Sequence, residues 1–122
     1  GVRFEGGPVG AGYRIIADCG ANVGTVLGPE IHDWSGHNLM DFPVMLRVNG
    51  AQVAEGNSSS LLWDHISDAV IWTLRQPAVR DRGLLSGDLI MTGTFTGITP
   101  LSSGDQVEAD FGKMGVIRSS FV

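Results

Sequence analysis

The sequence predicts an α+β domain that is mainly β, with one main helix. Three observations support this class. Glycine supplies 18 of the 122 residues, which suits tight turns and short strands better than long helices. Short apolar and β-branched segments recur between turn residues. A single segment has the apolar spacing of a helix. This length supports one core, so we expect residues 1–122 to form a single domain.

The predicted strands are short and are bounded by Gly, Pro, Asn or Asp. In chain order they cover residues 13–17, 23–27, 44–48, 51–55, 88–91, 106–111 and 115–121. The strongest local signal is Asn49-Gly50, because both central residues of a type I′ hairpin turn need a positive φ. Residues 29–43 show neither a strand nor a helix period and predict a long loop, a kind of segment that is often functional or mobile.

The one predicted helix begins after the serine-rich stretch near residue 60. Its apolar residues fall on a single helical stripe: Trp63, Ile66, Val70 and Leu74. Ser59 or Ser60 is expected to cap its start, since a serine hydroxyl can accept a bond from a free backbone N–H. Pro77 limits its end, because proline cannot continue a helix.

The composition excludes several classes of protein. The net charge is −5 and the eight Lys and Arg residues form no cluster, which argues against a nucleic-acid partner. No apolar run approaches the roughly 18 residues that span a membrane, and no secretory signal is visible. The single cysteine, Cys19, excludes an internal disulfide framework and fits a reducing compartment. We therefore expect a cytoplasmic protein.

A few polar residues are candidates for catalysis or ligand binding. Asp18 follows an apolar strand, where a carboxylate either stabilises the turn or accepts a proton. The segment Thr92-Gly93-Thr94 follows another predicted strand, and its N–H groups and hydroxyls could bind a carboxylate or enolate. The alternative is a plain turn at the end of a strand. Cys19 is interpreted as a small buried residue rather than a nucleophile.

The histidines and the alternating acids have simpler interpretations. His65 lies near the helix start, and a lone histidine is usually structural or exposed. The spacing of His32, Asp33 and His37 is only a weak metal pattern. Glu108 and Asp110 alternate along a predicted strand and share one face. Such a pair more often marks a solvated face than a metal site.

Several short motifs occur in a fixed order along the chain. The first is Ala-Asp-Cys-Gly-Ala-Asn-Val-Gly-Thr-Val-Leu-Gly at residues 17–28. The later ones are Asn49-Gly50, Val53-Ala54-Glu55-Gly56, Asp64-His65-Ile66, Ala69-Val70-Ile71-Trp72, Gly83-Leu84-Leu85-Ser86-Gly87-Asp88, Thr92-Gly93-Thr94, Pro100, Gly104-Asp105, Ala109-Asp110-Phe111 and Gly112-Lys113-Met114-Gly115.

This ordered set resembles the C-terminal half of the fumarylacetoacetate hydrolase superfamily, in its 2-hydroxypentadienoate hydratase and 4-oxalocrotonate decarboxylase branch. The resemblance covers residues 13–121. It implies a compact mixed β-sandwich roll, barrel-like in outline. The implied activity is that of a small-molecule lyase, a hydratase or decarboxylase of a 2-oxo or 2-hydroxy-dienoate acid. It also implies a catalytic role for one residue, Asp18, and a substrate-binding role for five: Asn22, His65, Thr92, Gly93 and Thr94.

The resemblance also implies what lies outside this chain. Family members are longer, and they hold Mg or Mn with a Glu-x-Glu pair and a third acidic residue, all upstream. We therefore expect no metal ligand in this chain, which begins with Gly1, and expect it to form a homo-oligomer or to pair with a missing N-terminal half. Cys19, Ala21 and Ile66 stand where the family has Asn, Ser and Pro. These differences leave two alternatives open: a metal-independent isomerase or cyclase of a polyene or polyketide, and a non-catalytic pseudoenzyme subunit.

Overall fold

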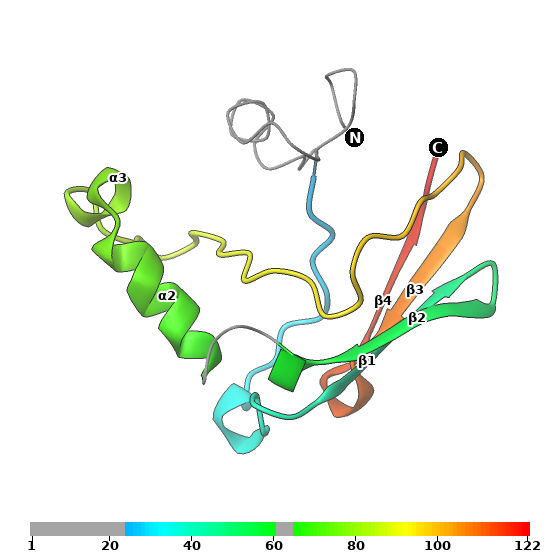
Figure 1. Ribbon diagram of the computed structural model, residues 1–122, viewed down its shortest axis with the longest axis horizontal. Coiled ribbons are helices and arrows are strands. Elements are labelled where there is room, and N and C mark those ends of the chain that lie inside the picture. Colours follow the sequence, from blue (N-terminus) through cyan, green and yellow to red (C-terminus); the bar gives the residue numbers. More distant parts are fainter. Residues whose placement is uncertain (1–23, 61–64) are drawn as a thin grey trace.

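The computed structural model describes residues 24–60 and 65–122 (Figure 1). One antiparallel sheet has the strand order β2-β1-β3-β4. Its strands are β1 Pro43–Val48, β2 Ala51–Asn57, β3 Gln106–Asp110 and β4 Val116–Ser120. The helices are α2 Ile66–Arg75 and α3 Pro77–Arg80, with 3-10 turns η2 Trp34–Gly36, η3 Ser58–Ser60 and η4 Gly112–Met114. The predicted α+β, mainly β class is confirmed, and the single domain over residues 1–122 stays a prediction.

The Asn49-Gly50 turn joins β1 to β2 as predicted. Both residues have positive φ, 52° and 82°, which a type I′ turn requires. The Asn49 amide also anchors the turn to the start of β3: it donates to Asp105 Oδ1 at 2.8 Å and accepts from the Gln106 N–H at 2.9 Å. The Ser102 backbone N–H and the Asn49 amide together hold the pKa of Asp105 below its usual value.

The main helix begins at Ile66, and the predicted serine cap is wrong. His65 is the N-cap: its Nδ1 accepts from the Ser67 N–H at 3.1 Å, and its own N–H donates to Asp68 Oδ2 at 2.9 Å. Ser59 and Ser60 belong to η3 instead, where both bond to Asn57. The predicted stripe residue Trp63 lies outside the described residues.

Two predicted strands are wrong in the part of the chain that the structure covers. Residues 24–27 are extended but pair with no strand, and Val26 and Leu27 are exposed. Residues 88–91 also lack a ladder, because Asp88 closes a turn: its N–H donates to the Leu85 carbonyl at 3.0 Å. The predicted strand at 13–17 lies outside the described residues.

The buried core is thin. Among the described residues the fully buried apolar side chains are Val44, 4% exposed, and Ala69, 6% exposed. Figure 1 shows α2 and α3 as an arm set apart from the sheet, with residues 24–30 and 83–105 running between them. The described residues therefore leave several large apolar side chains exposed.

Candidate functional site

The segment after Met91 touches the sheet at Gly56, close to the end of β2. A Cβ atom at Gly56 would overlap the carbonyl oxygen of Phe95, so only glycine lets the two backbones come this close. The Phe95 ring packs edge-on against Phe42, with centroids 5.4 Å apart and planes at 79°. This contact fixes the segment that contains Thr92 and Thr94.

Phe42 is itself held by a buried serine. The Phe42 N–H donates to Ser58 Oγ at 2.9 Å, and the Ser58 N–H donates to the Phe42 carbonyl at 3.0 Å. Ser58 is 4% exposed and is fully used in this exchange. The sequence did not predict that Gly56, Phe42 and Phe95 anchor this segment. A glycine inside a strand, which often marks a close backbone approach, was the available signal.

Thr92, Gly93 and Thr94 form the bend that this anchor positions. Gly93 has a φ of 117°, a conformation that residues with a Cβ rarely adopt. The Thr94 hydroxyl donates to the Gly97 carbonyl at 2.9 Å and accepts from the Thr96 N–H at 3.2 Å. The hydroxyl therefore shapes its own turn. Substrate binding by these three residues stays a prediction.

Of the other predicted site residues, the structure describes only His65. His65 uses Nδ1 in the helix cap and lies 2.5 Å from Ser67 Oγ, so a substrate could reach only its Nε2. Asp18 and Asn22 lie outside the described residues. Their catalytic and binding roles, and the substrate contact of His65, stay predictions.

A cavity of about 350 Å³ adjoins the bend on the side of the helical arm. Its lining includes Thr73 from α2 and the stretch Leu89, Ile90 and Met91 that leads into Thr92. Arg82 and Asp88 stand at this cavity and form a bidentate pair with two N–O distances of 3.0 Å. The apolar lining and the ion pair suit a small organic molecule.

Asp88 has a depressed pKa, first because Arg82 donates hydrogen bonds to it and then because the Leu85 N–H does. Its contribution to stability is therefore fully present above the ordinary aspartate pKa and is lost as pH falls through the folded-state pKa. We expect Asp88→Asn to lower the urea midpoint at neutral pH, and the difference from wild type to shrink in acid.

The matched control for this pair is Asp81→Asn, since Asp81 makes a single 3.4 Å contact with Arg80 and both are exposed. It should change the midpoint little at any pH. An Asp88→Asn deficit that is independent of pH would contradict the electrostatic role.

The face carrying Glu108 and Asp110 is occupied by ion pairs. Arg47 lies 2.7 Å from Glu108 and 3.6 Å from Asp110, and Arg118 lies 2.8 Å from Glu108. The carboxylates do share one face, as predicted, and arginines neutralise them there.

No group of three His, Cys, Asp or Glu side chains within residues 24–60 and 65–122 is arranged to hold a metal ion. The weak pattern of His32, Asp33 and His37 is not assembled into such a group. These residues do not fit a divalent cation, which prefers several converging oxygen ligands. None of the helices in the described ranges is long and apolar enough to cross a membrane.

We expect Mg²⁺ and Mn²⁺ not to bind this chain with useful affinity, because its described acids are dispersed or paired with arginine. Isothermal calorimetry at neutral pH measures this directly. A stoichiometric site with micromolar affinity would show that the remaining residues complete a metal centre.

Sequence relatives agree with this architecture. A family model described as the fumarylacetoacetate (FAA) hydrolase C-terminal region matches residues 12–122. The 2-oxo-hept-4-ene-1,7-dioate hydratase of Escherichia coli is 31% identical over 110 residues, which cover 90% of this chain and 41% of that protein. An uncharacterized protein from Archaeoglobus fulgidus is 34% identical over 96 residues, 79% of this chain and 35% of that protein. The chain thus spans about two fifths of the length of these relatives.

Solved structures share the fold. The 4-oxalocrotonate decarboxylase from Pseudomonas putida G7 complexed with magnesium and adipate superimposes with a TM-score of 0.77 at 22% identity, covering 89% of this chain and 41% of that one. Its complex with calcium and acetate gives the same TM-score and identity. The family model covers nearly the whole chain, and this protein therefore belongs to the fumarylacetoacetate hydrolase family, of which it represents the C-terminal region.

Proposed function

We propose that this chain is the C-terminal part of a lyase, a hydratase or decarboxylase that acts on a small 2-oxo or 2-hydroxy-dienoate acid in the cytoplasm. The observation that supports this most is the relation to the Escherichia coli hydratase over 90% of the chain. Within the described residues, the site is proposed to lie at the Thr92–Thr94 bend, which is anchored by the contact between Gly56 and Phe95.

The bend is proposed to hold the acidic end of the substrate. Fixed backbone N–H groups stabilise a carboxylate or a developing enolate best when they need no rearrangement. The Gly56 contact and the Thr94 hydrogen bonds provide that fixed geometry. Asp18 is proposed to accept a proton from the substrate, with Asn22 and His65 as further polar contacts. The described residues do not fit the family's metal, so no step is assigned to it.

A direct assay tests the proposal. In its native assembly, the protein should consume 2-hydroxypenta-2,4-dienoate, followed by loss of dienol absorbance, or release carbon dioxide from 4-oxalocrotonate. Asp18→Asn should slow either reaction by about 100-fold or more if Asp18 is the general base. A protein that neither binds nor converts these acids would refute the proposed function.

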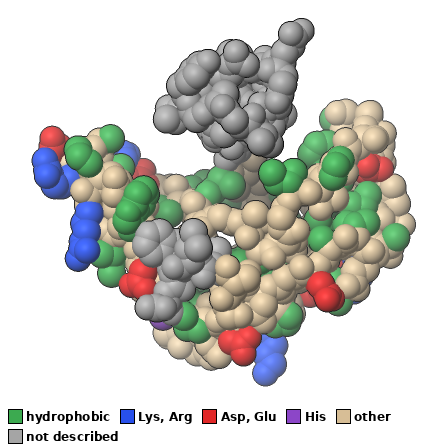
Figure 2. Space-filling view, viewed as in Figure 1, with side chains coloured by type: hydrophobic (Ala, Val, Ile, Leu, Met, Phe, Trp, Pro, Cys, Tyr) green, Lys and Arg blue, Asp and Glu red, His purple; other side chains and the backbone are tan. Residues whose placement is uncertain are grey.

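We also propose that the chain pairs with a second copy or with an N-terminal half. Among the described residues, Leu85, Leu89 and Ile98 are exposed apolar side chains. Figure 2 shows hydrophobic side chains on the helical arm and on the sheet side of the same view. Such surface usually meets a partner.

Sedimentation equilibrium checks this pairing. We expect a mass above 12.9 kDa for the isolated chain, because association covers the exposed apolar surface. Substituting Leu89 by Ser should lower the association without lowering the melting temperature of any remaining monomer. A stable, well-folded monomer at all concentrations would contradict the proposal.

A further inference from the structure

A second cavity lies at the end of the sheet where β1 begins, next to the contact between Phe42 and Phe95. It has a volume of about 510 Å³ and is formed by residues 36–43 and 111–114. Figure 1 shows η2 and η4 at this end, and residues 83–105 pass it on their way from the arm to the start of β3. The cavity shares no lining residue with the one beside Asp88. Its volume is in the range of small-molecule sites.

The apolar wall of this cavity is fixed by its backbone. Phe42 is held by the buried Ser58. On the other side, the Phe111 N–H donates to the Gly115 carbonyl at 2.9 Å, and the Gly112 N–H donates to Asp110 Oδ1 at 2.9 Å. The wall therefore needs no folding step to receive a ligand, which lowers the cost of binding.

The same wall also borders a neighbouring hollow. Phe42, Phe111 and Met114 line both the large cavity and an apolar hollow of about 270 Å³. Methionine adapts its shape readily, so Met114 can adjust between the two spaces. An apolar body of the size of a phenyl ring has room to pack here.

Three side chains with ionisable groups on the lining favour a monoanion. They are His37, Asp41 and Lys113. Asp41 accepts a hydrogen bond from Asn57 at 2.9 Å, whereas Lys113 forms no ion pair with any residue that the structure describes. Lys113 is also the only lysine of the chain. A single carboxylate gains from Lys113 and His37, while a dianion such as phosphate meets greater repulsion from Asp41.

We propose that this cavity binds a small carboxylate with an apolar body. The carboxylate pairs with the Lys113 ammonium and the His37 ring, and the apolar body packs on Phe42, Phe111 and Met114. This site adjoins the proposed lyase site, because Phe42 also packs against Phe95, but its ligand and its lining lysine are its own and the proposal does not depend on the lyase activity.

The single lysine makes the test specific. Reductive ¹³C-dimethylation keeps the charge of Lys113 and gives one lysine signal in the NMR spectrum. Phenylacetate should shift this signal in a saturable way, and the neutral isostere phenylacetamide should bind about tenfold more weakly or not at all. Binding of both molecules to the unmodified protein is measured by amide NMR.

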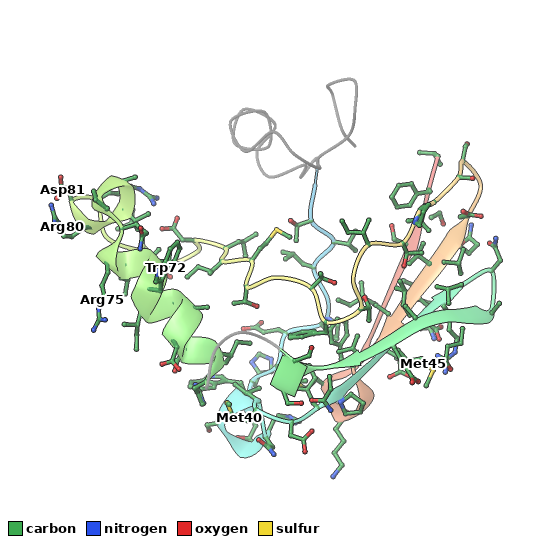
Figure 3. All side chains as sticks on the ribbon, in the orientation of Figure 1. Met40, Met45, Trp72, Arg75, Arg80 and Asp81 are labelled. Carbon is green, nitrogen blue, oxygen red and sulfur yellow. The ribbon has the colours of Figure 1, made fainter. Side chains whose placement is uncertain are left out.

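Two variants complete the experiment. Lys113→Gln should weaken phenylacetate binding by about fivefold or more, and it should fold normally because Lys113 is exposed. Arg75→Gln removes the same charge from α2, on the helical arm (Figure 3), and should leave the affinity unchanged. Equal binding of acid and amide, unchanged affinity in Lys113→Gln, or no saturable binding of phenylacetate would each overturn the proposal.

Discussion

Gly56→Ala should destabilise the protein by about 1–3 kcal/mol, the usual cost of forcing extra atoms into a packed contact. The added methyl group would overlap the carbonyl oxygen of Phe95, and a backbone atom cannot move aside as a flexible side chain can. The segment from Thr92 to Thr96 must then leave the sheet. Chemical denaturation gives the stability, and amide NMR shifts show whether the segment has moved.

The control for this variant is Gly24→Ala. A Cβ atom at Gly24 meets nothing within 4 Å, and its φ lies outside the left-handed range. This substitution should change the stability by at most a few tenths of a kcal/mol. If both variants cost the same, the close approach of Gly56 to Phe95 does not anchor the segment.

Thr94→Val should weaken binding of a 2-oxo acid by about 1–3 kcal/mol, roughly 5- to 150-fold. The valine keeps the side-chain shape and loses the hydroxyl that bonds to Gly97 and Thr96. Thr94→Ser retains that hydroxyl and should keep most of the affinity. Equilibrium binding measured on both variants separates the effect of the hydrogen bonds from the effect of side-chain shape.

Equal affinities for the valine and serine variants would mean that the bend does not bind substrate. Gly93→Val is a less specific probe of the bend than the Thr94 variants. With a φ of 117° at Gly93, a β-branched residue is strained whatever space surrounds it. We therefore expect this variant to lose stability as well as any ligand.

Local rules made the hairpin predictable. Asn49 and Gly50 both have positive φ, and the type I′ turn follows from these two residues alone. The short apolar segments on either side of the turn then gave β1 and β2 to within two positions. The two C-terminal strands were also predictable from turn residues, since Gly104-Asp105 precedes β3 and Gly115 precedes β4.

Features that depend on distant or unusual partners were not predictable. Residues 88–91 have the composition of a strand, yet Asp88 is drawn into a pair with Arg82 and a turn with Leu85. Histidine is an uncommon N-cap, so the sequence favoured Ser59 or Ser60 over His65. The contact between Gly56 and Phe95 joins residues far apart in the chain, and no local pattern states which segment approaches a strand glycine.

The central claim is that the Thr92–Thr94 bend receives the acidic end of a small 2-oxo acid. The most direct measurement is a titration of the ¹⁵N-labelled protein with a 2-oxo acid such as 2-oxopentanoate, followed by amide NMR. The predicted result is saturable shifts that are largest at Gly93 and Thr94, are retained in Thr94→Ser and are much weaker in Thr94→Val. Saturable shifts centred elsewhere, with residues 92–94 unmoved, would contradict the account.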